Sequence, residues 1–244
     1  MNFIFKAGTG KNHIYAFTLA EVLITLTIIG VIAALTIPNL VRNYQETATV
    51  NKVKKFHSTL SSAFSRAVKE YGPVDEWGLK ERKKADAEKI YEILFKPYFK
   101  INKNCGTANQ GNCIANTTYK LLNNGSSTSY GTKDTYYKAT LSDGAAVFWR
   151  GADTKSFNIF YDINGTREPN QWGKDLFQFY ATYEYIAPAG LPSGAYSFDS
   201  NTFDNTCTSS SQNGYGCAAW LVYKGNMDYL HCADLRWNGK TKCK

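Results

Sequence analysis

The feature that most constrains this chain is a membrane-length apolar run near its N-terminus. Residues 17–40 contain a single charged side chain, the carboxylate of Glu21. About 20 consecutive apolar residues are enough for a helix to cross the hydrocarbon core of a bilayer. A charge inside such a helix costs about 2.5–3.5 kcal/mol, so intramembrane carboxylates usually have a function. The run therefore predicts a membrane-spanning helix with Glu21 as its candidate functional group.

The residues before this run do not form an ordinary secretory signal. Such a signal is cleaved after its apolar core, whereas here a short polar leader, residues 1–16 with Lys6 and Lys11, ends directly before the core. The junction reads Ala16-Phe17-Thr18-Leu19-Ala20-Glu21. This pattern closely resembles the prepilin processing motif of type IV pilins and type II secretion pseudopilins, with Ala in the position that usually holds Gly.

The resemblance implies how the N-terminus is processed and used. A prepilin peptidase would cleave between Ala16 and Phe17, and the new amine of Phe17 would be methylated. In an assembled filament, Glu21 would neutralise the amine of a neighbouring subunit, because an unpaired charge in an apolar surrounding is costly. Gly30 and Pro38 lie where the first helix of the family usually has Gly and Pro, and Pro38 should kink that helix.

Three parts follow along the chain: a cleaved leader (1–16), a membrane and assembly segment (17–40) and an extracytoplasmic head (41–244). The first helix is expected to run from about Phe17 to about Tyr71 and to enter the head as an amphipathic helix. Its head half places apolar side chains at three- and four-residue steps, which is one face of a helix. These are Val53, Phe56, Leu60, Phe64, Ala67 and Tyr71.

The rest of the head predicts an antiparallel sheet that covers this amphipathic face, an α+β fold of pilin-like layout. Residues 79–99 indicate a shorter helix with Ile90 and Leu94 turned inward. Residues 101–132 and 187–214 indicate loops. Expected strands are 136–142 and 145–149, joined by a tight primed turn at Asp143-Gly144, followed by 157–163, 176–185 and 218–223.

Six cysteines follow the apolar run, and none forms a Cys-x-x-Cys pair. Zinc-site spacing is therefore absent. Cysteines on the far side of a membrane segment indicate disulfides in an oxidising compartment. The sequence cannot select one pairing, and pairing of neighbours is the simplest. The neighbours are Cys105 and Cys113, Cys207 and Cys217, and Cys232 and Cys243.

One oxygen-rich run offers weak candidates for a metal site. It begins Asp162-Ile-Asn164-Gly and ends at Asp175. The run lacks the acidic steps and closing Glu of an EF-hand loop, although similar runs recur in heads of the pilin family and some pseudopilins hold calcium. The alternative, which we favour, is a turn in which Asp and Asn side chains bond nearby backbone. We expect no cofactor otherwise.

Charge and the C-terminal tail leave nucleic-acid binding open but not favoured. The formal net charge is +8, which permits attraction to anionic surfaces. The tail combines aromatic and basic residues that could stack on bases or could close a small core under the disulfides: Tyr229, Arg236, Trp237 and Lys240. His13, His57 (expected on a helix surface) and His231 are isolated, and no catalytic constellation or phosphate-binding loop is evident.

These observations predict a non-enzymatic subunit of a type IV pilus or a type II secretion pseudopilus. It would cross the bacterial inner membrane once, with its head in the periplasm or outside. Its partners would be copies of itself or other pilin-like subunits, the prepilin peptidase and the inner-membrane assembly machinery. Two alternatives stay open: a minor or competence-type pilin that binds DNA or a surface, and a signal-anchored extracytoplasmic binding domain or enzyme.

Overall fold

The computed structural model describes residues 18–108, 112–127, 131–183, 185–192, 202–208 and 212–243. Helix α1 (Leu19–Tyr71) is continuous through Pro38, which confirms the long first helix. The chain divides into two compact units, Met1–Tyr44 and Gln45–Lys244. The second unit, called the head below, contains the sheet, the remaining helices and the hydrophobic core.

The head half of α1 buries the predicted apolar stripe except for its last member, Tyr71, which is exposed where the helix ends. Val53, Leu60 and Ala67 are fully buried, and Phe56 stacks on Tyr161 of the sheet with ring centroids 4.0 Å apart. Burying a Phe or Leu side chain contributes roughly 1.5–3 kcal/mol. The helix ends where Gly72 takes φ +77° and donates its N–H to the carbonyl of Val68 at 2.9 Å.

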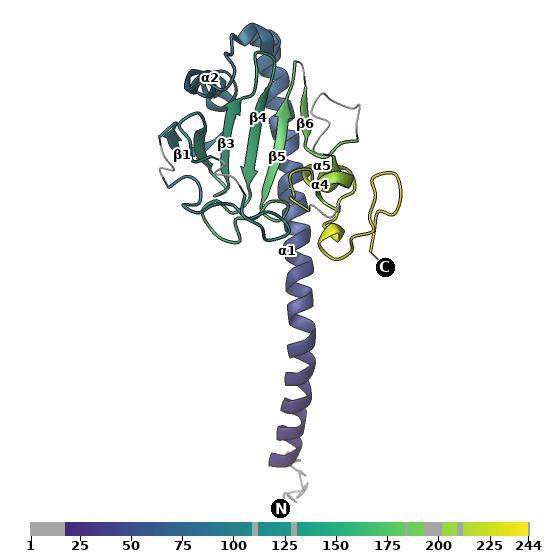
Figure 1. Ribbon diagram of the computed structural model, residues 1–244. Helices are drawn as coiled ribbons and strands as arrows, with labels where there is room; N and C mark the ends of the chain where they lie inside the picture. The colour runs from purple at the N-terminus through teal and green to yellow at the C-terminus, as the bar shows by residue number, and fades with distance from the viewer. Residues whose placement is uncertain are drawn as a thin grey trace, which may run out of the picture. The chain divides into compact units, whose positions relative to one another are not determined.

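Across α1 lies a single six-stranded antiparallel sheet in the order β1-β2-β3-β4-β5-β6 (Figure 1), so each strand pairs with its sequence neighbour within the described residues. A helix on an antiparallel sheet, followed by C-terminal disulfides, is the expected α+β pilin-like layout. The strands are β1 (Ile101–Gly106), β2 (Tyr137–Leu141), β3 (Ala146–Gly151), β4 (Phe157–Asp162), β5 (Leu176–Ala181) and β6 (Ile186–Pro188).

The second face of the sheet is also covered, by residues 114–119 and 172–176. Phe148 and Phe160 point to this side and stack with centroids 4.9 Å apart, while Tyr119 and Trp172 close over them. Central strands are therefore buried on both faces, and every residue of β5 is buried. Two covered faces explain why these strands read as almost continuous apolar runs.

The helical segments of the head are short apart from α1. The predicted helix 79–99 begins only at Lys84 and runs through α2 (Lys84–Ile90), the π-helical turn η2 (Tyr91–Phe95) and α3 (Lys96–Tyr98), with Ile90 and Leu94 fully buried as expected. The remaining segments are the 3-10 turn η1 (Val74–Trp77), α4 (Phe203–Thr206), α5 (Ala218–Tyr223) and η4 (Asp228–Leu230).

Two predictions for the first half of the sheet need correction, one of a loop and one of a turn. Residues 101–106, expected to be loop, form the edge strand β1, which is mostly solvent-exposed and interrupted by register shifts. An exposed edge strand needs no alternating apolar pattern, so no such pattern marks β1 in the sequence. The Asp143 turn is not a two-residue primed turn: Gly144 donates to Leu141 O, Leu141 donates to Ala145 O, and Gly144 takes φ +85°. That is a three-residue hairpin loop.

The expected strand at 218–223 is wrong, because these residues form helix α5. A short apolar run does not distinguish a buried strand from a buried helix. Here Ala218, Trp220 and Leu221 face the core, and Ala219 N–H donates to Ala189 O at 2.8 Å. The expected loop 187–214 likewise contains the end of β6 and helix α4, and the strand at 176–185 stops at Ala181.

The three disulfides join neighbours: Cys105 to Cys113, Cys207 to Cys217 and Cys232 to Cys243. The first closes the loop that follows β1, the second connects α4 to the start of α5, and the third closes the C-terminal loop. None of the six cysteines is free.

His57 is half-buried rather than on the helix surface, since its ring lies 5.9 Å from that of Phe179 in β5. Burial lowers the pKa of His57 from its ordinary value near 6.5. Near and below pH 6.5 the imidazole of His57 takes up a proton more readily in the unfolded chain than in the folded head. The unfolding free energy therefore falls as the pH falls. We expect the unfolding free energy of the wild type to fall more than that of His57→Gln between pH 7.5 and 5, measured by urea unfolding. Equal slopes would contradict this.

Candidate functional site

The candidate site begins at the N-terminus of α1, where Thr18 and Glu21 cap the helix reciprocally. Glu21 N–H donates to Thr18 Oγ1 at 3.2 Å, and the Glu21 carboxylate accepts from Thr18 N–H at 2.9 Å and from Thr18 Oγ1 at 2.8 Å. This is the capping box, Ser or Thr followed three residues later by Glu or Gln. Sequence reasoning identified Glu21 as functional but missed this second role.

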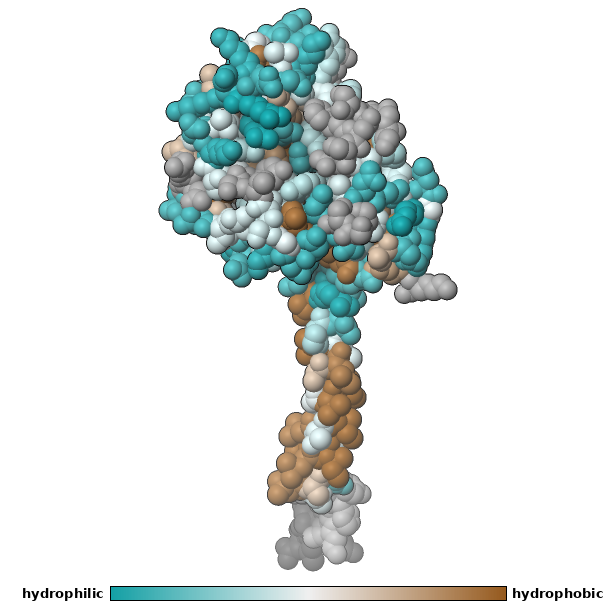
Figure 2. Space-filling model, in the orientation of Figure 1, coloured by the Kyte–Doolittle hydropathy of each residue, from teal (hydrophilic) through white to brown (hydrophobic). Residues whose placement is uncertain are grey.

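The first unit of the chain offers an apolar helical surface without a partner in the described residues. Figure 2 shows it as a hydrophobic stretch, and its large side chains are exposed, up to 78% for Leu19. Within the described part of the chain, α1 is the one helix long and apolar enough to cross a membrane. The exposed residues are Leu19, Val22, Leu23, Ile24, Leu26, Ile28, Ile29, Val31, Ile32, Leu35, Ile37, Leu40, Val41 and Tyr44.

The polar side chains within this surface are satisfied by the helix itself. The hydroxyls of Thr25, Thr27 and Thr36 donate to carbonyls three or four residues earlier, at 2.8–2.9 Å. A hydroxyl that bonds its own helix needs no water. Because polar groups in lipid must be satisfied internally, these three threonines fit a bilayer or a packed bundle of helices.

Gly30 and Pro38 both lie inside α1, and the helix continues through each. A side chain at Gly30 would meet no atom of its own chain within 4 Å, so the fold of one subunit does not require glycine there. The predicted cleavage and methylation residues, Ala16 and Phe17, lie outside the described residues, as does His13.

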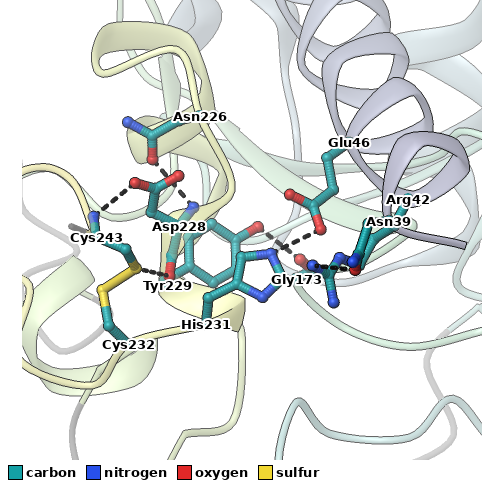
Figure 3. A network of polar contacts seen from close by, with 10 residues as sticks. All are labelled: Asn39, Arg42, Glu46, Gly173, Asn226, Asp228, Tyr229, His231, Cys232 and Cys243. Atoms are coloured by element: carbon teal, nitrogen blue, oxygen red, sulfur yellow. Dashed lines mark hydrogen bonds and ion pairs between the residues drawn. A yellow bond between two sulfur atoms is a disulfide. The ribbon is translucent and has the colours of Figure 1, made fainter. Parts of the chain in front are cut away.

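Within the head, a polar network ties the C-terminal tail to the beginning of its part of α1 (Figure 3). His231 Nε2 lies 2.8 Å from Glu46 Oε1, and Tyr229 donates its hydroxyl to Gly173 O at 2.6 Å. Asp228 accepts from the N–H of Cys243 at 2.7 Å, beside the Cys232–Cys243 bridge. No sequence pattern predicts the His231–Glu46 contact, which joins residues 185 positions apart.

The aromatic tail residues close a core rather than a stacking platform. Tyr229 is buried, and Trp237 packs against Phe203, Trp220 and Tyr223 with centroids 6.1–6.4 Å away. Arg236 donates to Ala233 O and Leu235 O, and Lys240 pairs with Asp234 at 2.6 Å. The basic and aromatic tail residues therefore have structural partners within the tail and head.

The weak metal candidates Asp162, Asn164 and Asp175 do come together, as hydrogen-bond partners. Asp162 accepts from Asn164 N–H, Gly165 N–H and the Tyr119 hydroxyl at 2.7–3.1 Å. Asp175 accepts from the N–H groups of residues 170 and 171 and from the Asn164 amide at 2.6–3.2 Å. Burial raises the pKa of both carboxyls, and Asp175 raises that of Asp162 further.

Each carboxylate oxygen of Asp162 and Asp175 thus accepts a hydrogen bond from a protein donor. This is the arrangement expected of a turn in which Asp and Asn side chains bond nearby backbone. Among the described residues no three His, Cys, Asp or Glu side chains group as metal ligands.

We expect a calcium chelator to leave the unfolding midpoint of the head unchanged and added calcium to raise it by less than about 1 °C. A calcium ion that bound only the folded head would raise this midpoint, and its removal would lower it. A chelator-dependent loss of several degrees would establish a calcium site.

Two family profiles match the chain. The profile described as Prokaryotic N-terminal methylation motif matches residues 11–37, and the profile described as Family of unknown function (DUF6613) matches residues 39–223. The first is the pilin and pseudopilin signature and confirms the resemblance at residues 16–21. No curated protein and no solved structure matches.

Proposed function

We propose that this chain, which belongs to the Family of unknown function (DUF6613) and is a type IV pilin- or pseudopilin-like precursor, is a structural subunit of a filament. The filament would be a type IV pilus or a type II secretion pseudopilus. The methylation motif and the one membrane-length apolar helix among the described residues fit a membrane-anchored, single-pass protein with an extracellular head. Its role in our proposal is mechanical, without catalysis by the head.

One observation carries the proposal: the first unit exposes a continuous apolar surface whose threonine hydroxyls are already satisfied. Such a surface is stable in lipid or against other apolar helices, but not in water. In a filament, the packed first helices of neighbouring subunits would surround this apolar surface once the subunit has left the bilayer. Gly30, with open space around it, would let neighbouring helices approach closely.

We place the parts of the precursor accordingly. Residues 1–16 are the leader, 17–40 lie in the inner membrane before assembly, and 41–244 form the periplasmic or extracellular head. The prepilin peptidase would cut between Ala16 and Phe17. After cleavage, the partners of the mature chain would be copies of itself or related subunits and the inner-membrane assembly machinery.

Glu21 would serve twice in this scheme. In the single subunit its carboxylate caps α1 together with Thr18. In the filament it would neutralise the amine of a neighbour's Phe17. Because the Thr18 donors leave lone pairs free on a carboxylate, capping does not prevent the second interaction.

Intact-mass and N-terminal peptide measurements test the processing step. We expect the mature protein to begin at an N-methylated Phe17, because the peptidase acts at the junction before the apolar helix. Replacing Ala16 with Leu should prevent cleavage, while the conservative Ala16→Gly should preserve it. A mature chain that keeps its leader, or that begins after residue 30, would overturn the proposal in favour of a simple anchor or an ordinary signal peptide.

A further inference from the structure

The head contains a cavity that the filament role does not use. It has a volume of about 420 Å³ and lies between α1, the end of α3 and the β2–β3 loop. That volume is within the roughly 300–1,000 Å³ of small-molecule sites in proteins. All of its lining residues belong to the head, and its apolar part is formed by Phe56, Phe99, Leu141 and Tyr161.

The rim of this cavity is positively charged. Lys52, Lys55 and Lys100 line it, against one carboxylate, Asp143. None of the three lysines forms an ion pair within the described residues. Lys52 does donate to the carbonyl of Ile163 at 3.3 Å, which holds its ammonium group beside strand β4. Asp143 accepts an N–H of its own loop, from Ala145 at 3.1 Å.

The apolar floor is aromatic and already partly stacked. Phe56 lies against Tyr161 with centroids 4.0 Å apart and is tilted toward Phe99 at 6.2 Å. Aromatic or aliphatic groups of a ligand can extend such contacts by stacking on the rings or packing against them. A ligand whose apolar part lies on this floor could place a negatively charged group within reach of the flexible lysine side chains at the rim.

We propose that this cavity binds a small amphiphilic carboxylate, with its apolar body on Phe56, Phe99 and Tyr161 and its carboxylate among Lys52, Lys55 and Lys100. Ordinary ion pairs at exposed sites contribute little, so the selectivity comes from the combination of floor and rim. Either an aromatic acid or a medium-chain fatty acid has this chemistry. All of the lining residues lie in the head, so the test of this site does not require cleavage of the leader.

Calorimetric titration of the full-length chain in zwitterionic nanodiscs tests this site, with empty nanodiscs as the blank. The probes are 2-naphthoate, the neutral 2-naphthamide and decanoate. We expect saturable binding of at least one carboxylate and at least tenfold weaker binding of the amide. Tighter binding of 2-naphthoate identifies an aromatic acid site, and tighter binding of decanoate a fatty acid site.

Three variants separate the charge of the rim from the space of the cavity. Combined Lys52→Gln, Lys55→Gln and Lys100→Gln should weaken binding at least tenfold, and Thr59→Trp should block the cavity. Lys69→Gln, in the last turn of the same helix and outside the cavity, should bind as the wild type does. Carboxylate binding that survives the triple substitution would overturn the proposal, as would no binding above the blank. Self-association through the same lysines without carboxylate binding would instead make the cavity a contact between copies.

Discussion

Replacing Glu21 with Gln should abolish filaments while leaving processed protein in the membrane. Gln can still complete the capping box with Thr18, and removing the charge makes insertion easier. What is lost is the partner of a neighbour's amine, and breaking a buried ion pair costs about 3–5 kcal/mol. We expect at least an approximately hundredfold lower filament yield, measured in sheared fractions against the membrane level of mature protein.

Thr18→Ala is the matched control, because it removes the capping partner and keeps the carboxylate. Loss of such a cap costs about 1 kcal/mol, so we expect frayed ends and a moderate reduction in yield. Intact mass of both variants would verify that cleavage continues. If Glu21→Gln assembled normally and Thr18→Ala did not, the carboxylate would matter for capping alone, and the proposed amine pairing would be wrong.

The second large effect is expected in the head, at Asp175. This carboxylate is 2% exposed and accepts from the N–H groups of Asn170 and Gln171 and from the side-chain amide of Asn164. Asp175→Ala would leave these three donors unpaired, and each buried unpaired group costs about 1–3 kcal/mol. We expect a loss of about 3–5 kcal/mol in unfolding free energy, measured by urea unfolding with Trp fluorescence. Trp172, fully buried beside this turn, is one of the five tryptophans whose fluorescence reports unfolding of the head.

Asp153→Ala provides the comparison at an exposed turn of the same kind. Asp153 accepts from Lys155 N–H at 2.7 Å and from the Ser156 hydroxyl at 2.8 Å, but it is exposed to water. Its donors can bond to solvent once the carboxylate is gone, so the cost should stay below about 1 kcal/mol. Similar losses at the two sites would show that burial of Asp175 is not what makes it important.

The parts of the fold that could be predicted from sequence are those with long, regular patterns. The first helix was predictable because its apolar run and its later stripe at Val53, Phe56 and Leu60 both follow helical spacing. The central strands β2, β3 and β4 were predictable from short apolar runs and the Asp143-Gly144 turn signal. Pairing of neighbouring cysteines was a guess from simplicity, and the structure has this pairing.

The parts that escaped prediction depend on what surrounds a residue. Lys138 in β2 would be expected to face water, yet it is fully buried and donates to Ala108 O and Tyr136 O at 2.9 Å. Burial lowers its pKa to about 8. Helix α5 was missed because six apolar residues suit a strand equally well. The contact of His231 with Glu46 was missed because sequence carries no signal for a pair so far apart.

The connectivity of the head has a consequence for its biogenesis. Each strand of the described sheet pairs with its sequence neighbour, and the three disulfides close over separations of only 8, 10 and 11 residues. Short loops close at little entropic cost, and local contacts form quickly. Each hairpin and each bridge can therefore form as soon as its own segment has been translocated, before the rest of the head arrives. A head that crosses in chain order, with its α1 segment first, would thus expose few unpaired strands or thiols to its neighbours at any stage of its crossing.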